Sequence, residues 1–331
     1  GIESSCDDTS VAVLHASENG FEILAEKTAS QIEVHKKYGG VVPEIAGRCH
    51  AENIMPVIEA VMDGQDKPDV IAVTSGPGLI TGLLVGTETA KALSYLWDVP
   101  LVGVNHIEGL IDSVELGYHT SYFRLQQTDY RSPKSEVRSL IQFPALCLVV
   151  SGGHTELILM REHGEYERIG ATRDDAAGEC FDKVGKLLGF DYPGGPKISK
   201  MATGGNSNAI QFPRPMIEDN NYDFSFAGLK TAVLYWLRDQ TSDLPDRQAG
   251  FRLQTSDICA SFEQAIVDVL ITKTIRAAQA HQPKTIILAG GVAANIKLRY
   301  SLEEAVKQHC PKSEVRSPKS EYCMDNGAMI A

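Results

Sequence analysis

Residues 145–160 read ALCLVVSGGHTELILM, in which an apolar strand leads into a Ser-Gly-Gly turn and a second apolar strand. The same arrangement opens the chain, where residues 1–13 read GIESSCDDTSVAV. A third apolar run, TIILAGGVAAN at 285–295, ends in small residues and opens a predicted helix. Small residues let backbone N–H groups approach an anion, and a helix N-terminus adds positive potential. Three such turns predict a nucleotide site assembled from two lobes.

Strand-like and helix-like segments alternate along the chain, which is typical of an α/β fold. Helices are predicted at 42–62, with Pro43 at the start, and at 83–97. Strands are predicted at 69–74, 101–104 and 286–289. The two hairpins begin about 145 residues apart, which indicates a divergent internal duplication and two similar lobes. We place an N-terminal lobe at 1–111, a connection or insertion at 112–142, and a C-terminal lobe at 143–331. The C-terminal end of the chain could pack back on the first lobe.

Composition limits the class of protein. The chain has 331 residues and an apolar content of 43%, which suits one large or two medium globular domains. No apolar run is long enough to cross a bilayer, so we expect no membrane association. The seven cysteines form no CxxC pair, which favours reduced thiols in the cytoplasm over a disulfide framework. With a net charge of −12, a nucleic-acid partner would require a local basic patch or a helper subunit.

Two turns carry candidate chemistry, and each also has a purely structural explanation. Ser151, Gly152 and Gly153 either cradle a phosphate or form an ordinary hairpin turn, and the matching turn at residues 4–9 favours the phosphate. Asp7 and Asp8 could hold a metal–phosphate complex or position a nucleophile. Aspartates are also common in turns, and that explanation is the stronger one for this pair when it is taken alone.

A helix is predicted over 172–189, with Thr172 as its N-cap. Its apolar face includes Cys180, Phe181, Val184, Leu187 and Leu188. Asp182 falls on the opposite side, together with Gly178 and Gly185. Glycines inside a helix each cost roughly 1 kcal/mol relative to alanine, so we expect a close approach there. Either a ligand hydroxyl meets Asp182, or another backbone packs on the glycines and Asp182 is solvated.

The Gly-Gly-Val-Ala-Ala-Asn turn at 290–295 follows the last predicted strand. Its small residues would let an adenine ring or ribose lie against the backbone, although a tight strand-to-helix turn would use them too. His106 follows a predicted strand and Asp325 lies near the C-terminus. Neither residue alone indicates a metal site, and the chain has no HExxH motif.

A series of segments runs in order along the whole chain: GIESSCDDTS, HKKYGGVVPEIAGR, TSGPGLITGLLVG, GVNHIEG, LVVSGGHTEL, AGECFDKVGKLLGFDYPGGP, NYDFSFAGLKT, LAGGVAAN and YCMDNGAMIA. Together they resemble the bacterial TsaD (Gcp) family of tRNA threonylcarbamoyladenosine transferases. The resemblance implies an actin/Hsp70-like (ASKHA) fold, with duplicated RNase H-like domains and a nucleotide cleft between two lobes. It also implies transfer of a threonylcarbamoyl group from threonylcarbamoyl-AMP to the exocyclic amine of the adenosine 3′ of the anticodon, in tRNAs reading codons that begin with A. An aromatic amine is a poor nucleophile, so such an enzyme must orient it and stabilise the developing charge.

The resemblance also implies site residues by motif. The substrate-binding residues would be Val149, Val150, Ser151, Gly152, Gly153, Asp182, Gly195 and Asn295. Asp182 and Gly195 would meet the ribose, and Asn295 would lie at the adenine end. Asp7 would be the acid of the N-terminal turn that activity requires. The family's metal, iron or zinc, would lie between His106 and Asp325.

One position departs from the family pattern. The family has a His-x-x-x-His pair, but the second histidine is replaced here by Leu110. Imidazole suits iron or zinc and leucine cannot coordinate, so we expect weakened metal binding unless phosphate and water complete the shell. His119 and His154 are possible substitutes.

The resemblance implies partners as well. These are tRNA, a TsaB-like paralogue, a TsaE-like ATPase and a TsaC-type enzyme that supplies the intermediate, with ATP or threonylcarbamoyl-AMP as ligand. Leu110 leaves open a second reading, in which the chain is a catalytically impaired nucleotide-binding scaffold of the same complex. A small-molecule kinase of the same superfold is a third.

Overall fold

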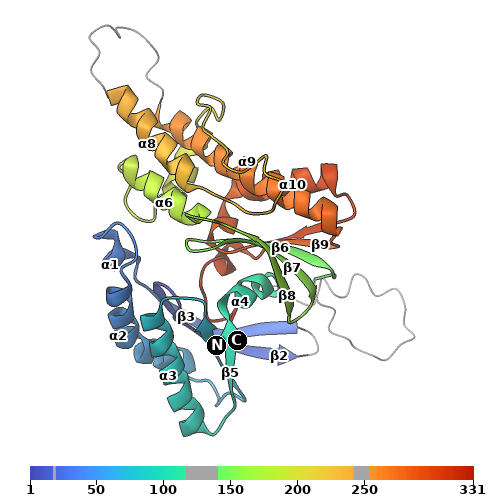
Figure 1. The fold of residues 1–331 in the computed structure, drawn as a ribbon. Helices are drawn as coiled ribbons and strands as arrows, with labels where there is room; N and C mark the ends of the chain where they lie inside the picture. Colours follow the sequence, from blue (N-terminus) through green and yellow to red (C-terminus); the bar gives the residue numbers. More distant parts are fainter. Residues whose placement is uncertain (18–19, 117–140, 242–253) are drawn as a thin grey trace. The chain divides into compact units, whose positions relative to one another are not determined.

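The computed structural model describes residues 1–17, 20–116, 141–241 and 254–331. These residues form two compact units, drawn as ribbons in Figure 1: unit 1 comprises residues 1–142 and 317–331, and unit 2 comprises residues 143–316. Most of the predicted connection at 112–142 lies outside the described residues.

Unit 1 is built on a five-stranded mixed sheet with the order β3-β2-β1-β4-β5. Its strands are β1 (Ile2–Glu3), β2 (Asp8–Ser17), β3 (Gly20–Ser30), β4 (Ile71–Gly76) and β5 (Leu101–Asn105). Strands β1, β2 and β3 are antiparallel, whereas β1, β4 and β5 are parallel. Its helices are α1 (Ile32–Lys36), α2 (Pro43–Met62), α3 (Ile80–Trp97) and α4 (His106–Asp112).

The core of unit 1 lies between its sheet and the helices α2 and α3. Ile2 and Val73 contribute from the sheet, Ile54 from α2 and Leu93 from α3. Helix α2 begins at Pro43, as predicted, since proline has no N–H to leave unpaired in the first turn. Helix α3 begins three residues before its predicted start, directly after the Gly-Pro-Gly turn.

Unit 2 is built on a second five-stranded sheet with the order β10-β9-β6-β7-β8. Its strands are β6 (Ala145–Val150), β7 (Thr155–Glu162), β8 (Glu165–Ala171), β9 (Thr285–Ala289) and β10 (Glu314–Arg316). Its helices are α6 (Ala177–Leu187), α7 (Gly194–Ala202), α8 (Ala227–Thr241), α9 (Thr255–His281) and α10 (Ile296–His309). A short 3₁₀ segment of unit 2 occurs at Gly291–Ala294, and two of unit 1 occur at Ser113–Glu115 and Ser320–Tyr322.

The two sheets share one topology. In each, the first strand of the unit is central, an antiparallel hairpin extends it on one side, and two parallel strands extend it on the other. The predicted internal duplication is therefore confirmed at the level of strand order. All six residues of β6 are buried, which explains why this strand is apolar throughout.

Residues 317–331, which the sequence analysis assigned to the C-terminal lobe with the option of packing back, group with unit 1. The Gly327 N–H donates to Ser10 Oγ over 2.9 Å, and the Ala328 N–H donates to the Glu26 carboxylate over 3.3 Å. A Cβ on Gly327 would lie 2.6 Å from the backbone of Val11, so glycine allows this approach to β2. The end of the chain thus packs against the first hairpin.

The predicted helix at 172–189 is wrong at its start. Helix α6 begins at Ala177, and Thr172 pairs with Phe224 in an isolated bridge. The Thr172 hydroxyl donates to the Asp175 carbonyl over 2.7 Å, so it stabilises the loop before the helix and does not cap the helix itself. Leu187, predicted on the apolar face, is exposed.

Among the described helices, none combines the length and the apolar character needed to cross a bilayer.

Candidate functional site

Two of the glycine-rich turns lie at the same edge of the unit 2 sheet. Strands β6 and β9 are parallel and pair Val149 with Ala289, so the turns that follow them emerge together. Gly290 has a φ of +89°, and a Cβ there would lie 2.6 Å from the Val150 carbonyl oxygen. Only glycine fits both conditions, so the turn after β9 is held tightly against the end of β6.

The Ser151 turn leaves its glycines open. Ser151 N–H donates to the His154 carbonyl over 2.8 Å, and His154 N–H donates to Ser151 Oγ over 3.1 Å, which closes the turn. A Cβ on Gly152 or Gly153 would meet no atom within 4 Å. An open glycine backbone is what a bound phosphate needs for close approach.

Helix α6 packs its N-terminus on this turn. The Gly178 N–H donates to the Ser151 carbonyl over 3.2 Å, and a Cβ on Gly178 would lie 2.5 Å from that oxygen. On the next turns of α6, a Cβ on Gly185 would lie 2.7 Å from Gly194 Cα. The close approach expected at the two helix glycines is therefore made by other backbone segments.

Asp182 is bonded within the protein and is not merely solvated. Its Oδ1 accepts from the N–H groups of Gly194 and Gly195, over 2.8 and 3.2 Å. These are the first residues of α7, so the Asp182 carboxylate caps the N-terminus of that helix. The ribose contact implied for Asp182 and Gly195 stays a prediction.

Asn295 links three helices. Its side-chain oxygen accepts from the Leu298 N–H over 2.8 Å and so caps α10. Its side-chain nitrogen donates to Ser199 Oγ on α7 over 2.8 Å and to the buried Glu263 carboxylate on α9 over 2.7 Å. The sequence analysis missed Ser199 and Glu263, because nothing in the motifs connects these distant helices to the turn. The adenine contact implied for Asn295 stays a prediction.

These contacts form a closed circuit. The Ser151 turn binds α6, Asp182 of α6 binds the start of α7, and Ser199 of α7 binds Asn295. The turn before Asn295 returns to the end of β6 through Gly290. The structure therefore brings every substrate-binding residue that the resemblance implied into one region of unit 2.

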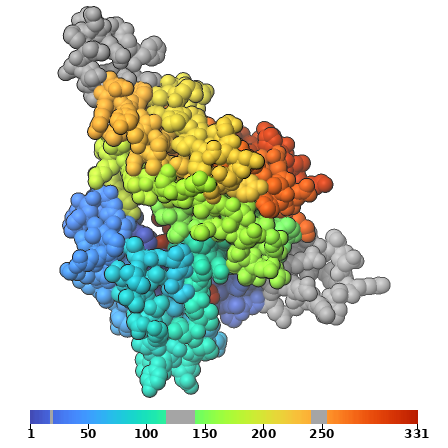
Figure 2. Space-filling model, in the orientation of Figure 1, coloured from blue at the N-terminus to red at the C-terminus, as the bar shows by residue number. Residues whose placement is uncertain are grey.

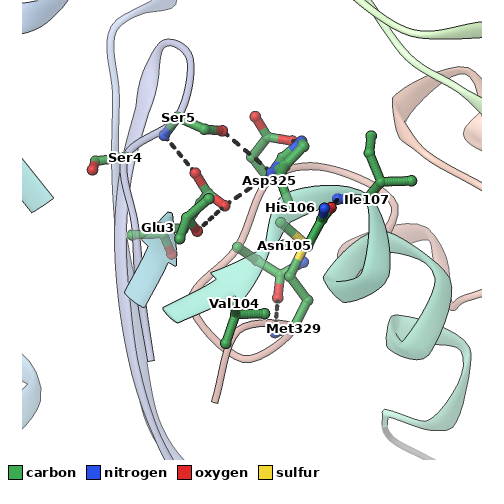
Figure 3. Close-up of polar contacts among 12 residues, drawn as sticks. Glu3, Ser4, Ser5, Val104, Asn105, His106, Ile107, Asp325 and Met329 are labelled. Atoms are coloured by element: carbon green, nitrogen blue, oxygen red, sulfur yellow. Dashed lines mark hydrogen bonds and ion pairs between the residues drawn. The ribbon is translucent and has the colours of Figure 1, made fainter. Parts of the chain in front are cut away.

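The predicted metal pair lies in unit 1. His106 is the first residue of α4; its Nδ1 lies 3.0 Å from Glu3 Oε2 and 3.2 Å from Ser5 Oγ (Figure 3). Its Nε2 lies 3.6 Å from Asp325 Oδ1, so the predicted pair is in contact. The sequence analysis missed Glu3, whose only signal was an acidic side chain inside a buried strand.

Charges around His106 shift the pKa values of the group. Burial alone would lower the pKa of His106, but the carboxylates of Asp325 and Glu3 raise it to about 9. Burial raises the pKa of Asp325 to about 7, and the negative charges of Glu3, Asp8 and Asp7 add to this against the opposing effect of His106. The two acidic side chains therefore favour the protonated form of His106.

The described residues do not fit iron or zinc at this place. Within residues 1–17, 20–116, 141–241 and 254–331, no three His, Cys, Asp or Glu side chains are arranged to hold a metal. Leu110 is fully buried one helical turn after His106. Of the suggested substitutes, His154 belongs to the Ser151 turn of unit 2, and His119 lies outside the described residues. Two protein ligands are fewer than the three that a catalytic zinc site uses.

Solved structures support the fold. HypF of T. kodakarensis matches with a TM-score of 0.57 and 15% identity, over 99% of this chain and 47% of that one, so this chain spans about half the length of HypF. Component A of (R)-2-hydroxyglutaryl-CoA dehydratase from Acidaminococcus fermentans matches with a TM-score of 0.52 and 12% identity, over 100% of this chain and 94% of that one. At these identities the likeness is one of fold alone.

Sequence relatives identify the family. The family described as "TsaD: tRNA N6-adenosine threonylcarbamoyltransferase" matches residues 22–123 and 131–331. The tRNA N6-adenosine threonylcarbamoyltransferase of Bacillus subtilis is 48% identical over 100% of this chain and 88% of its own length. That of Bacillus licheniformis is 47% identical over 100% of this chain and 89% of its own length. The chain is therefore a transferase and belongs to the TsaD family.

Proposed function

We propose that this chain transfers the threonylcarbamoyl group of threonylcarbamoyl-AMP to the exocyclic N6 amine of the adenosine 3′ of the anticodon, in tRNAs reading codons that begin with A. The amine nitrogen attacks the carbamoyl carbon and forms a C–N bond. The bond from that carbon to the phosphate oxygen breaks, and AMP leaves with the electron pair. The amine gives up one proton.

The closed circuit of contacts in unit 2 is the observation that carries this proposal. It presents the open Gly152–Gly153 backbone at one end of a strand pair, beside the N-terminus of α6. Open backbone donors suit the phosphate of an adenylate and the charge that develops as AMP departs. The N-terminus of α6 adds positive potential beside them, while its first two N–H groups are bonded to Thr155 and Ser151. The same circuit supports ATP as an alternative ligand of the site.

We assign the acid–base role to Asp7, on the match of its turn to the family motif. A carboxylate placed near the amine can accept the proton that N6 loses. Asp7 lies in the bend between β1 and β2 of unit 1, and its carbonyl accepts from the Gln31 N–H over 3.1 Å. No step is assigned to a metal, because the described residues around His106 do not fit one.

The surface of α3 supports a protein partner. Ile80, Leu84, Tyr95 and Leu96 are exposed on this helix, with Tyr95 92% and Leu96 74% accessible. Figure 2 shows the residues of α3, in cyan and teal, at the surface. Two of these side chains lie near each end of the helix, and the exposed ion pair of Lys91 with Glu88 lies between them in sequence. Exposed apolar side chains rimmed by charge are typical of interaction sites, and we assign this surface to the TsaB-like paralogue. With the net charge of −12, shared tRNA binding by such a complex, completed by the TsaE-like ATPase and supplied by a TsaC-type enzyme, is the natural arrangement.

Location follows from the substrate. We place the reaction in the cytoplasm, where tRNA is modified. All seven cysteines are free, as expected for a protein in a reducing compartment.

The test is product formation on tRNA. The chain would be mixed with its TsaB-like and TsaE-like partners, threonylcarbamoyl-AMP and unmodified tRNA, and the digested tRNA analysed by mass spectrometry. We expect threonylcarbamoyladenosine from the natural chain and a loss of about 100-fold or more in Asp7→Asn, since removing a proton acceptor costs a factor of about 10² to 10⁴.

A second function is favoured by one observation, the buried Leu110. The scaffold function predicts that this chain binds the adenylate but makes no product, under conditions in which the Bacillus subtilis relative does make product. ATP consumption by the chain alone with a sugar or acid would instead indicate a small-molecule kinase.

A further inference from the structure

The backbone of the turn that carries Asp7 is held by three separate segments of unit 1. The Ser5 carbonyl accepts from the Leu79 N–H over 2.7 Å, just before α3. The Asp7 carbonyl accepts from the Gln31 N–H over 3.1 Å, just after β3. Between them, the Cys6 carbonyl faces Nε2 of His50, on α2, over 3.1 Å. Three consecutive carbonyls are thus fixed from three directions.

His50 reaches both sides of this turn. Because the Cys6 carbonyl can only accept, His50 Nε2 must carry the proton and donate it. In the neutral ring Nδ1 is then an acceptor, and the Thr9 hydroxyl donates to it over 2.8 Å. The ring therefore bridges Cys6 and Thr9, the residues that flank Asp7 and Asp8.

The ring is also enclosed by packing. His50 and Thr9 are both fully buried. A Cβ on Gly82 of α3 would lie 3.0 Å from His50 Nε2 and would collide with the Ser4 carbonyl oxygen. Gly82 thereby lets α3 pack directly on the ring and on the strand that leads into the turn.

We propose that His50 is a positioning residue for the transfer reaction, and that it sets the location of the Asp7 carboxylate by bridging the backbone at Cys6 to the side chain of Thr9. His50 touches no substrate; it acts through the turn. This inference rests on the function proposed above and on the role assigned to Asp7. By this inference a residue of α2 affects the reaction although it does not contact the substrate.

Three variants separate positioning from general stability. His50→Leu fills roughly the same space with an apolar side chain and removes both hydrogen bonds. His50→Gln restores a donor for Cys6 and an acceptor for Thr9. Ile54→Ala is the matched control, because Ile54 is buried one turn further along α2 and its aliphatic side chain forms no hydrogen bond with the turn that carries Asp7.

The kinetic readout is kcat and KM for tRNA modification in the complete complex. We expect His50→Leu to lose about 100-fold in kcat with KM for threonylcarbamoyl-AMP unchanged, since a displacement of about 1 Å has an effect of this size. His50→Gln should recover most of the loss. Ile54→Ala should keep its kcat even where its melting temperature falls as far as that of His50→Leu. Natural kcat in His50→Leu, or an equal loss in Ile54→Ala, would overturn the proposal.

Hydrogen exchange measured on the same proteins tests the bridge without any activity. Peptides covering residues 4–12 should exchange faster in His50→Leu than in the natural chain, His50→Gln or Ile54→Ala. If the natural chain makes no product, the proposed function fails, and exchange still decides whether His50 holds the turn. If product forms and exchange is the same in all four proteins, His50 does not position Asp7.

Discussion

Leu110 offers the sharpest test of how this chain differs from the family pattern. Replacing it by histidine restores the His-x-x-x-His spacing, and residues four apart lie on one face of α4. In the Leu110→His variant, the introduced imidazole would join His106 and Asp325 to supply three protein ligands, the number found in catalytic zinc sites. We expect the variant to bind one zinc or iron ion and the natural chain to bind none.

The magnitude follows from the burial of Leu110, which is 0% exposed. A buried polar ring without a partner costs about 1–3 kcal/mol, so metal-free Leu110→His should be less stable than the natural chain by this amount. For a domain the size of unit 1, about 2 kcal/mol lowers the melting temperature by about 4–8 °C. Zinc at about 100 times its dissociation constant should stabilise the folded Leu110→His variant by about 2.7 kcal/mol and so reverse the loss of stability.

The assay combines metal content by mass spectrometry with thermal melts in zinc and in chelator. Leu110→Gln is the control, since it buries a polar group of similar size that is a poor ligand for zinc. The natural chain should melt at the same temperature in zinc and in chelator, and Leu110→Gln should melt lower in both. One tightly held metal in the natural chain, lost in chelator together with several degrees of stability, would refute the reasoning.

Three further predictions follow from the described contacts. Asp182→Ala removes the cap of α7 and should lower the unfolding free energy by about 0.5–2 kcal/mol in urea. Its affinity for the adenylate, measured by calorimetry, should fall clearly, and an unchanged affinity would show that α7 does not contribute to the site. Gly290→Ala places a Cβ against the Val150 carbonyl at a positive φ and should cost about 1–3 kcal/mol or more in the same unfolding assay. Burial lowers the pKa of His35 and His50 below the usual 6.5, so the unfolded chain takes up protons first as the pH falls. The contribution of these two histidines to the unfolding free energy should therefore be complete above about pH 6.5 and decline below it. In urea melts, the difference in unfolding free energy between the natural chain and His50→Gln should be smaller at about pH 5.5 than at about pH 7.5, and a difference that grows at the lower pH would contradict this.

Local patterns along the sequence were enough to predict most of the fold. Pro43 marked the start of α2, and the apolar run 145–150 marked the central strand of unit 2. The repeated strand–turn–strand pattern predicted two related lobes, and the shared strand order confirms it. The predicted start of α6 was wrong because Thr172, with aspartates two and three residues later, resembles a helix N-cap and first turn. In the structure a long-range bridge from Thr172 to Phe224 extends the loop there.

The site was harder to predict, because its geometry depends on contacts between distant residues. The two glycines of α6 correctly indicated a close approach, but their spacing could not show that Gly194 and the Ser151 turn make it. Asp182 could not be identified as the cap of a helix that starts twelve residues later. Glu3 was overlooked because its partner His106 is more than a hundred residues away.

The central claim is that this chain transfers threonylcarbamoyl to tRNA without a metal held by the pair at His106 and Asp325. The most direct measurement is a single-turnover reaction of chelator-treated chain, in its complete complex, with isotope-labelled threonylcarbamoyl-AMP and unmodified tRNA. Labelled threonylcarbamoyladenosine from the natural chain, at a yield that Leu110→His with zinc does not exceed, is the predicted result. Product from Leu110→His with zinc and none from the natural chain would contradict the claim.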